Sequence, residues 1–146
     1  MGTVLVQGQH YELASLWERW LGQLLDGLIY FAIFFGPGVL LSFLVGPMVV
    51  YFGFAAAVFY LFFQDGLSDG RSLGKRMLGT KVIDAETGNP CGFGQSFVRN
   101  VLLVVLNWID WIFIFGQKRQ RLGDKAAQTY VVKQDAVSLD ALHRGN

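Results

Sequence analysis

Long apolar stretches, separated by polar ones, dominate the pattern of this chain. Residues 27–63 contain no Asp, Glu, Lys or Arg, and the apolar character begins several residues earlier. Because a hydrocarbon core of about 30 Å takes about 20 helical residues, the stretch is long enough for two crossings. We therefore predict a membrane-spanning helix over residues 16–35 and a return helix over residues 39–63. The Gly-Pro-Gly sequence at residues 36–38 is the expected turn between them.

Two features of the return helix carry further expectations. Pro47 lies within it, and proline interrupts helical hydrogen bonding, so we expect a kink there. Alternatively the helix begins at Pro47, with residues 39–46 lying along the membrane interface. Gly53, Ala56 and Ala57 form a face of small residues, which favours close packing of helices in a membrane.

A third apolar segment, residues 98–115, contains both charged and amide side chains. If it crossed the membrane fully, the basic stretches at 71–81 and 118–125 would lie on opposite sides. Basic loops favour the cytoplasm, so we prefer a re-entrant or interfacial segment broken near residues 107–110 over a full crossing. The N-terminus, the central loop and the C-terminus would then all be cytoplasmic.

Two short segments alternate between apolar and polar residues in the manner of β-strands. They cover residues 79–84 and 129–133, and a lone strand is marginal, so we expect them to pair on one face of the membrane. The predicted fold class is an all-α membrane protein. It has a transmembrane helical hairpin, a third spanning or re-entrant apolar segment, and a small two-stranded cytoplasmic β element.

Composition excludes several classes of function. Hydrophobic residues make up 53% of the chain and the net charge is +1, so we expect no nucleic-acid partner. Cys91 is the single cysteine, and His10 and His143 lie at opposite ends of the chain. We therefore predict no metal site and no cofactor. The sequence contains no recognisable catalytic triad or carboxylate pair, so we expect a protein that is not an enzyme.

The first predicted helix has a polar stripe along one face. Arg19, Gln23, Asp26 and Tyr30 are spaced by four, three and four residues, which aligns them on a helix. A charged side chain within a span costs about 2.5–3.5 kcal/mol on insertion scales and is usually paired and functional. Arg19 lies too far along the helix to pair with Asp26. The possible partners of Asp26 are therefore Arg99, a proton or a bound cation.

This stripe has two interpretations, and the sequence leaves both open. In the first, it lines a proton or cation site to which Arg99, Asp110 and Asp124 contribute. In the second, it is a polar seam between helices that fixes their packing. The seam is the more ordinary interpretation, because a chain of 146 residues would need an oligomer to form a complete pathway.

A basic cluster follows the second predicted helix. The Gly70-Arg-Ser-Leu-Gly74-Lys75 sequence superficially resembles a phosphate-binding loop. However, three residues rather than four separate the glycines, and Arg76 stands where Ser or Thr should follow the lysine. We instead predict that the cluster binds anionic lipid headgroups, at about 1 kcal/mol per charge. Its members are Arg71, Lys75, Arg76 and Lys81.

Four motifs in order resemble the RDD family of small, mostly bacterial membrane proteins. They are Trp17-Glu-Arg19-Trp-Leu-x-x-x-x-Asp26, Ser72-Leu-Gly-Lys-Arg-Met-Leu-Gly-Thr-Lys-Val-Ile-Asp84, Phe97-Val-Arg99-Asn, and Gln120-Arg-Leu-Gly-Asp124-Lys-Ala-Ala-Gln-Thr-Tyr-Val-Val132. Arg19, Asp26 and Asp124 match the arginine and two aspartates that name the family. Gln128 departs from the glycine that members often have there.

The resemblance covers residues 14–133, which implies one membrane domain followed by a polar C-terminal tail at 134–146. It implies a multi-pass protein of the bacterial cytoplasmic (inner) membrane, with membrane lipids and either a homo-oligomer or a larger membrane complex as partners. Transport of protons, cations or small solutes is the usual suggestion for this family, and we place it slightly ahead. The alternative is an accessory or scaffold subunit that packs against a larger membrane complex.

Overall fold

The structure is a computed structural model that describes residues 2–106 and 108–133. The helices are α1 (Leu16–Ile33), η1 (Phe34–Leu40), α2 (Leu41–Val45), α3 (Val49–Phe63), η2 (Gln64–Gly66), α4 (Leu73–Met77), α5 (Phe93–Leu106), α6 (Trp108–Ile112), η3 (Phe113–Phe115) and α7 (Leu122–Ala126). The strands are β1 (Thr3–Val6), β2 (Gln9–Glu12), β3 (Thr80–Asp84) and β4 (Thr129–Lys133). The predicted tail at 134–146 lies outside the described residues, and so does His143.

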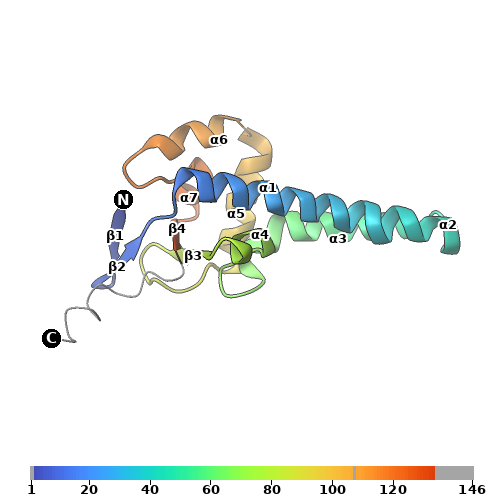
Figure 1. The fold of residues 1–146 in the computed structure, drawn as a ribbon, viewed down its shortest axis with the longest axis horizontal. Coiled ribbons are helices and arrows are strands. Elements are labelled where there is room, and N and C mark those ends of the chain that lie inside the picture. The colour runs from blue at the N-terminus through green and yellow to red at the C-terminus, as the bar shows by residue number, and fades with distance from the viewer. Residues whose placement is uncertain (1, 107, 134–146) are drawn as a thin grey trace.

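A long helical arm projects from a head that holds both sheets and the helices α4, α5, α6 and α7 (Figure 1). One side of the arm is α1 with its continuation through η1 and α2, and the other side is α3. Two helices, Leu16–Val45 and Val49–Gly66, are long and apolar enough to cross a membrane. The prediction of a mostly helical chain with two long apolar helices is therefore confirmed.

The first helix begins at a capping box. The backbone N–H of Glu18 donates to Ser15 Oγ at 3.1 Å, and the backbone N–H of Ser15 donates to Glu18 Oε2 at 2.7 Å. Together these bonds satisfy two of the N–H groups that a helix start leaves without partners. The start at Leu16 agrees with the sequence prediction.

The turn predicted at residues 36–38 was wrong. This segment lies in η1, a π-helical stretch around Pro37, and α2 extends the same arm beyond it. The chain reverses only at Gly46, whose φ of 122° suits glycine and few other residues. Pro47 follows, and α3 begins two residues later at Val49. Of the two alternatives for Pro47, a helix that begins near it agrees better with the structure than a kink.

Glycine allows the two sides of the arm to pack backbone against backbone. A Cβ atom on Gly53 would lie 2.4 Å from the Cα of Gly38, which no real side chain tolerates. Gly53 and Ala57 of the predicted face of small residues are buried, whereas Ala56 is exposed. Gly38 therefore serves helix contact instead of chain reversal, whereas a Cβ atom on Gly36 would meet open space.

Both predicted strands form and pair with each other. β3 and β4 are antiparallel, with Val82 opposite Val131. A second hairpin, β1–β2, was not predicted from the sequence. Its turn is Gln7-Gly8, with φ values of 52° and 77°, and Leu13 bridges to Val132 so that the two sheets share a core.

The third apolar segment divides into shorter pieces. α5 begins at Phe93, ahead of the predicted start at residue 98, and ends at Leu106. Its 14 residues extend about 21 Å, which is shorter than a hydrocarbon core of about 30 Å. Residue 107 lies outside the described residues, and α6 begins directly after it. The segment is thus not a single long helix like either side of the arm.

Candidate functional site

Seven charged side chains meet where the arm joins the head, and none is more than 7% exposed. We call them the buried charge cluster: Arg19, Asp26, Asp65, Lys75, Arg99, Arg121 and Asp124. They come from α1, η2, α4, α5 and α7, with Arg121 as the N-cap of α7, so one cluster connects five helices. Buried charges persist only when they are paired and hydrogen-bonded, and each carboxylate here has basic partners.

Asp26 is surrounded by donors from the protein itself. Its Oδ1 accepts hydrogen bonds from Tyr60 Oη at 2.9 Å and from the backbone N–H of Gly74 at 2.8 Å. Its Oδ2 accepts a hydrogen bond from Ser72 Oγ and lies 3.4 Å from Lys75 Nζ. The cationic partner of Asp26 is therefore Lys75.

Glycine at position 74 is what permits this contact. A Cβ atom there would lie 2.6 Å from the carbonyl oxygen of Gly22 and 2.9 Å from Asp26 Oδ1. Ser72 begins the short helix α4 as its N-cap, and its Oγ accepts a hydrogen bond from the backbone N–H of Lys75 at 3.4 Å. The sequence Ser-Leu-Gly-Lys therefore brings α4 against α1 so that Lys75 faces Asp26.

The middle of the cluster alternates in charge. Lys75 Nζ lies 2.7 Å from Asp65 Oδ1, and Asp65 Oδ2 lies 3.6 Å from Arg99 Nη2. Arg99 Nη2 in turn lies 3.1 Å from Asp124 Oδ1. Arg99, which the sequence offers as a partner for Asp26, thus pairs with the other two carboxylates. The ion pairs form one continuous series from Asp26 to Asp124.

Like Arg121, Asp65 belongs to the buried charge cluster but was missed by sequence reasoning. It is fully buried and pairs with Lys75 and Arg99. The signal was its position, because Asp65 is the first charged residue after the apolar stretch 27–63, as Asp26 is the last before it. The two carboxylates at the base of a helical hairpin return to the same end of it, so they can share one lysine.

Asp124 accepts the densest set of cationic partners. Its Oδ2 pairs with Arg19 Nη2, and its Oδ1 lies 3.8 Å from Arg121 Nη2 in addition to the contact with Arg99. Burial opposes ionisation of this carboxyl group, but the three guanidinium groups outweigh burial and hold the pKa of Asp124 well below its ordinary value. Asp124 is therefore an ionised acceptor at neutral pH.

The remaining residues of the predicted stripe have different surroundings. Gln23 borders the cluster, and its Oε1 accepts a hydrogen bond from Arg121 Nη1 at 3.3 Å. Tyr30 lies farther along α1, where its ring meets Phe31 edge-on at 5.4 Å between centroids. The side chain of Asp110 lies outside the described part of the chain. The structure thus brings the first three members of the stripe to the cluster.

The four residues predicted to bind lipid headgroups are separated by the fold. Lys75 is 6% exposed and faces two carboxylates, because α4 docks against α1 through Gly74. Arg71 is half-buried and pairs with Asp69 at 3.3 Å. Arg76 is exposed and Lys81 is half-buried. Lys75 therefore belongs to the buried charge cluster and not to a basic cluster on the surface.

The chemistry that the structure shows in the cluster is ion pairing. Among the residues that the structure describes, no group of three or more His, Cys, Asp or Glu side chains could hold a metal ion. Each of the three carboxylates lies against at least one lysine or arginine. The cluster can therefore lock five helices together.

Comparison with known proteins places this architecture in a family. Residues 13–128 match the model of the RDD family. An uncharacterized protein of Haemophilus influenzae is 30% identical over 131 residues, which cover 84% of this chain and 79% of that protein. The proline-rich antigen of Mycobacterium leprae is 35% identical over 92 residues, 58% of this chain and 37% of the antigen. A proline-rich antigen homolog of Mycobacterium tuberculosis is 31% identical over 96 residues, 61% of this chain and 40% of the homolog.

The chain spans only about two fifths of the length of these mycobacterial relatives. No solved structure matches the chain. The family model covers most of the chain, and the residues matched include Arg19, Asp26 and Asp124 of the buried charge cluster. The protein therefore belongs to the RDD family.

Proposed function

We propose that this protein is a non-enzymatic, multi-pass protein of the bacterial cytoplasmic membrane that acts as an accessory subunit. Its helical arm packs against other membrane-embedded chains, either further copies or a larger complex. The observation that carries this proposal is the exposure of the arm. Only 6% of the most apolar window of Leu16–Val45 is buried within the molecule, and 28% of that of Val49–Gly66.

The side chains on the outside of the arm are large and apolar. Phe31, Phe43, Leu44 and Phe52 are each more than half exposed. Monomeric soluble proteins rarely expose contiguous apolar surface of this extent, so lipid or a partner must cover it. The arm uses its small residues for contact between its own two sides, and it therefore offers bulky side chains to whatever surrounds it.

The orientation follows from the same hairpin. α1 begins and α3 ends at the head, so the head lies on one side of the membrane (Figure 1). Basic segments favour the cytoplasmic side, which places the head there. The length of α5, 14 residues, favours a re-entrant or interfacial position for the third apolar segment.

The buried charge cluster supports an assembly role over transport. A cation could bind Asp26 only by displacing Lys75, Tyr60 or Ser72 from its oxygens. Removing one partner of a buried ion pair costs about 3–5 kcal/mol, which a weakly held transport ion cannot readily supply. The cluster acts in this proposal as the fixed base from which the arm projects.

Transport of protons or cations remains the second candidate, and one observation favours it. The ion pairs from Asp26 through Lys75, Asp65 and Arg99 to Asp124 form an unbroken series of ionisable groups. Ionisable residues within membrane proteins commonly mark ion pathways. The pathway would need further subunits to continue across the bilayer.

Extraction from native membranes in mild detergent, followed by native mass spectrometry, tests the assembly role. We expect stoichiometric recovery of the chain with additional membrane-embedded subunits. Reconstitution of the purified protein in vesicles then measures proton and sodium flux, with Asp26→Asn as the test variant and Asp69→Asn as a surface control. A monomer in native mass spectrometry, together with flux that Asp26→Asn abolishes, would overturn the accessory role and establish transport.

A further inference from the structure

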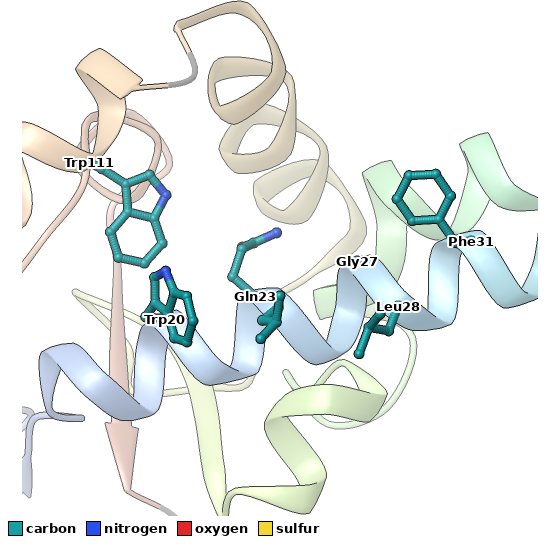
Figure 2. A pocket seen from close by; sticks show the side chains of 7 residues that line it. Trp20, Gln23, Gly27, Leu28, Phe31 and Trp111 are labelled. Atoms are coloured by element: carbon teal, nitrogen blue, oxygen red, sulfur yellow. The ribbon is translucent and has the colours of Figure 1, made fainter.

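An apolar groove runs along α1 and is closed at one end by α6. It encloses about 540 Å³, which is within the usual range for small-molecule sites. Trp20 and Trp111 stand at one end and Phe31 stands at the other, with Gln23 between them (Figure 2). The lining is mainly apolar and consists of Trp20, Gln23, Leu24, Gly27, Leu28, Phe31 and Trp111.

A second, much smaller cavity adjoins the tryptophan end of the groove. Gln23 and Trp111 line both. The other residues that line the small cavity are Arg19, Lys75, Thr80, Arg99, Arg121 and Val131. Half of its lining side chains are therefore basic, and none of the described carboxylates is among them. The groove is apolar along its length and faces basic side chains at one end only.

Arg121 connects the two cavities. Its guanidinium lies 5.5 Å from the centre of the Trp111 ring and donates a hydrogen bond to Gln23 Oε1 at 3.3 Å. The small cavity measures about 10 Å³, which holds no more than about one water molecule. A headgroup therefore cannot enter it. The four basic side chains of its lining face three carboxylates in the buried charge cluster, so the cluster carries one net positive charge. The field of that net charge acts on a charge at the mouth of the groove.

The position of the groove on the arm identifies its surroundings. The lining residues of α1 fall within the apolar helix Leu16–Val45, which the proposed function places in the bilayer. Tryptophan side chains gather at the level of lipid headgroups, and Trp17 stacks on Trp20 at 5.2 Å between ring centroids. The basic end of the groove is thus the interfacial end, and Phe31 lies deeper along the arm.

We propose that the groove binds one acyl chain of an anionic phospholipid, with the phosphate at the Gln23–Trp111 end. The inference rests on the proposed membrane location of the arm. An acyl chain matches the apolar lining, and a negative phosphate matches the net positive charge of the buried charge cluster behind Gln23. The lipid runs in the direction that the bilayer imposes, with its headgroup at the tryptophan side chains and its chain toward Phe31.

Gly27 provides a direct way to fill the groove. A Cβ atom on Gly27 meets no other atom within 4 Å, so Gly27→Leu places its side chain in open space along the groove. Gly36 is a matched control on the same arm, because a Cβ atom there also meets nothing within 4 Å and Gly36 does not line the groove. The two leucine variants add the same apolar surface.

The test is quenching of tryptophan fluorescence by phospholipids with brominated acyl chains. Trp17→Phe and Trp108→Phe leave Trp20 and Trp111 as the reporters at the groove. We expect brominated phosphatidylglycerol to bind about fivefold more tightly than brominated phosphatidylcholine, equivalent to about 1 kcal/mol. Gly27→Leu should abolish this preference, and Gly36→Leu should retain it.

Equal quenching by the two lipids in the parent protein would overturn the proposal. An undiminished preference for phosphatidylglycerol in Gly27→Leu would also overturn it. Quenching that disappears as the protein self-associates would do the same, because it would place a second copy in the groove. Flotation of each protein with the vesicles is measured in parallel. Loss of flotation would contradict the membrane location itself, whereas flotation without lipid preference contradicts the groove proposal alone.

Discussion

The guanidinium of Arg19 pairs with the carboxylate of Asp124, although the two residues are 105 positions apart in the chain. Arg19 Nη1 also donates a hydrogen bond to the carbonyl of Arg119 at 2.7 Å. Gly123 lets α7 approach this closely, because a Cβ atom there would lie 2.6 Å from the carbonyl oxygen of Arg99. The first turn of the arm is thereby attached to the last helix of the head.

Replacing Asp124 by Asn should destabilise the protein strongly. The amide keeps the shape of the side chain but removes the negative charge that faces Arg19 and Arg99. Leaving buried charges without compensation typically costs about 3–5 kcal/mol. The free energy of unfolding, measured by chemical denaturation in mild detergent, should fall by about that amount.

The matched control for this substitution is Asp69→Asn. The Asp69 side chain is 57% exposed and pairs with Arg71 at 3.3 Å, so its removal should change the free energy of unfolding by less than about 1 kcal/mol. Similar decreases in the free energy of unfolding of the two variants would show that the buried ion pairs stabilise the protein no more than a surface pair does.

Stability should also fall in acid. The pKa of Asp124 is lowered in the folded state, so the folded protein binds fewer protons there than the unfolded chain does. The resulting stability is fully present above the ordinary pKa of Asp, about 3.9, and is lost as pH falls below it. The free energy of unfolding should be measured between pH 7 and pH 3. It should stay level down to about pH 4 and decline below that pH.

Asp124→Asn isolates this contribution. Asp84 also has a lowered pKa, because the backbone N–H of Thr87 donates to its carboxylate, so some acid sensitivity should persist in the variant. The difference between the parent protein and the variant should therefore shrink as the pH falls. A difference that stays constant down to pH 3 would mean that Asp124 is not ionised in the folded protein.

The hairpin and the β3–β4 pair followed from local patterns, because apolar length and strand alternation are properties of single segments. The partners of the charged residues could not be obtained in this way. Lys75 lies in a basic stretch that looks solvated, and only the close approach of Gly74 to α1 turns it toward Asp26. The Gly-Pro-Gly sequence at 36–38 misled for a similar reason, since Gly38 packs against Gly53 across the hairpin.

Gly53→Ala should separate the two sides of the arm. The added Cβ atom would lie 2.4 Å from the Cα of Gly38, and a backbone atom cannot move aside as the end of a side chain can. Overpacking of this kind costs about 1–3 kcal/mol. The free energy of unfolding in mild detergent should fall accordingly, whereas Gly36→Ala, with open space around its Cβ position, should change it little. Equal effects of the two alanines would contradict the close contact at Gly38.

Cys91 should react slowly with iodoacetamide in the folded protein. Burial raises the pKa of its thiol to about 11, and the side chain is 3% exposed. Because the thiolate is the nucleophile, at pH 8 only about one thiol in a thousand is reactive, compared with about a quarter for an ordinary cysteine of pKa about 8.5. Alkylation should therefore be at least about a hundredfold slower than at a cysteine introduced on the surface.

Glu86→Cys in a Cys91→Ala background supplies that reference, because Glu86 is exposed in the turn between β3 and α5. Denaturation should bring the two rates together, and similar rates in the folded proteins would mean that Cys91 is accessible.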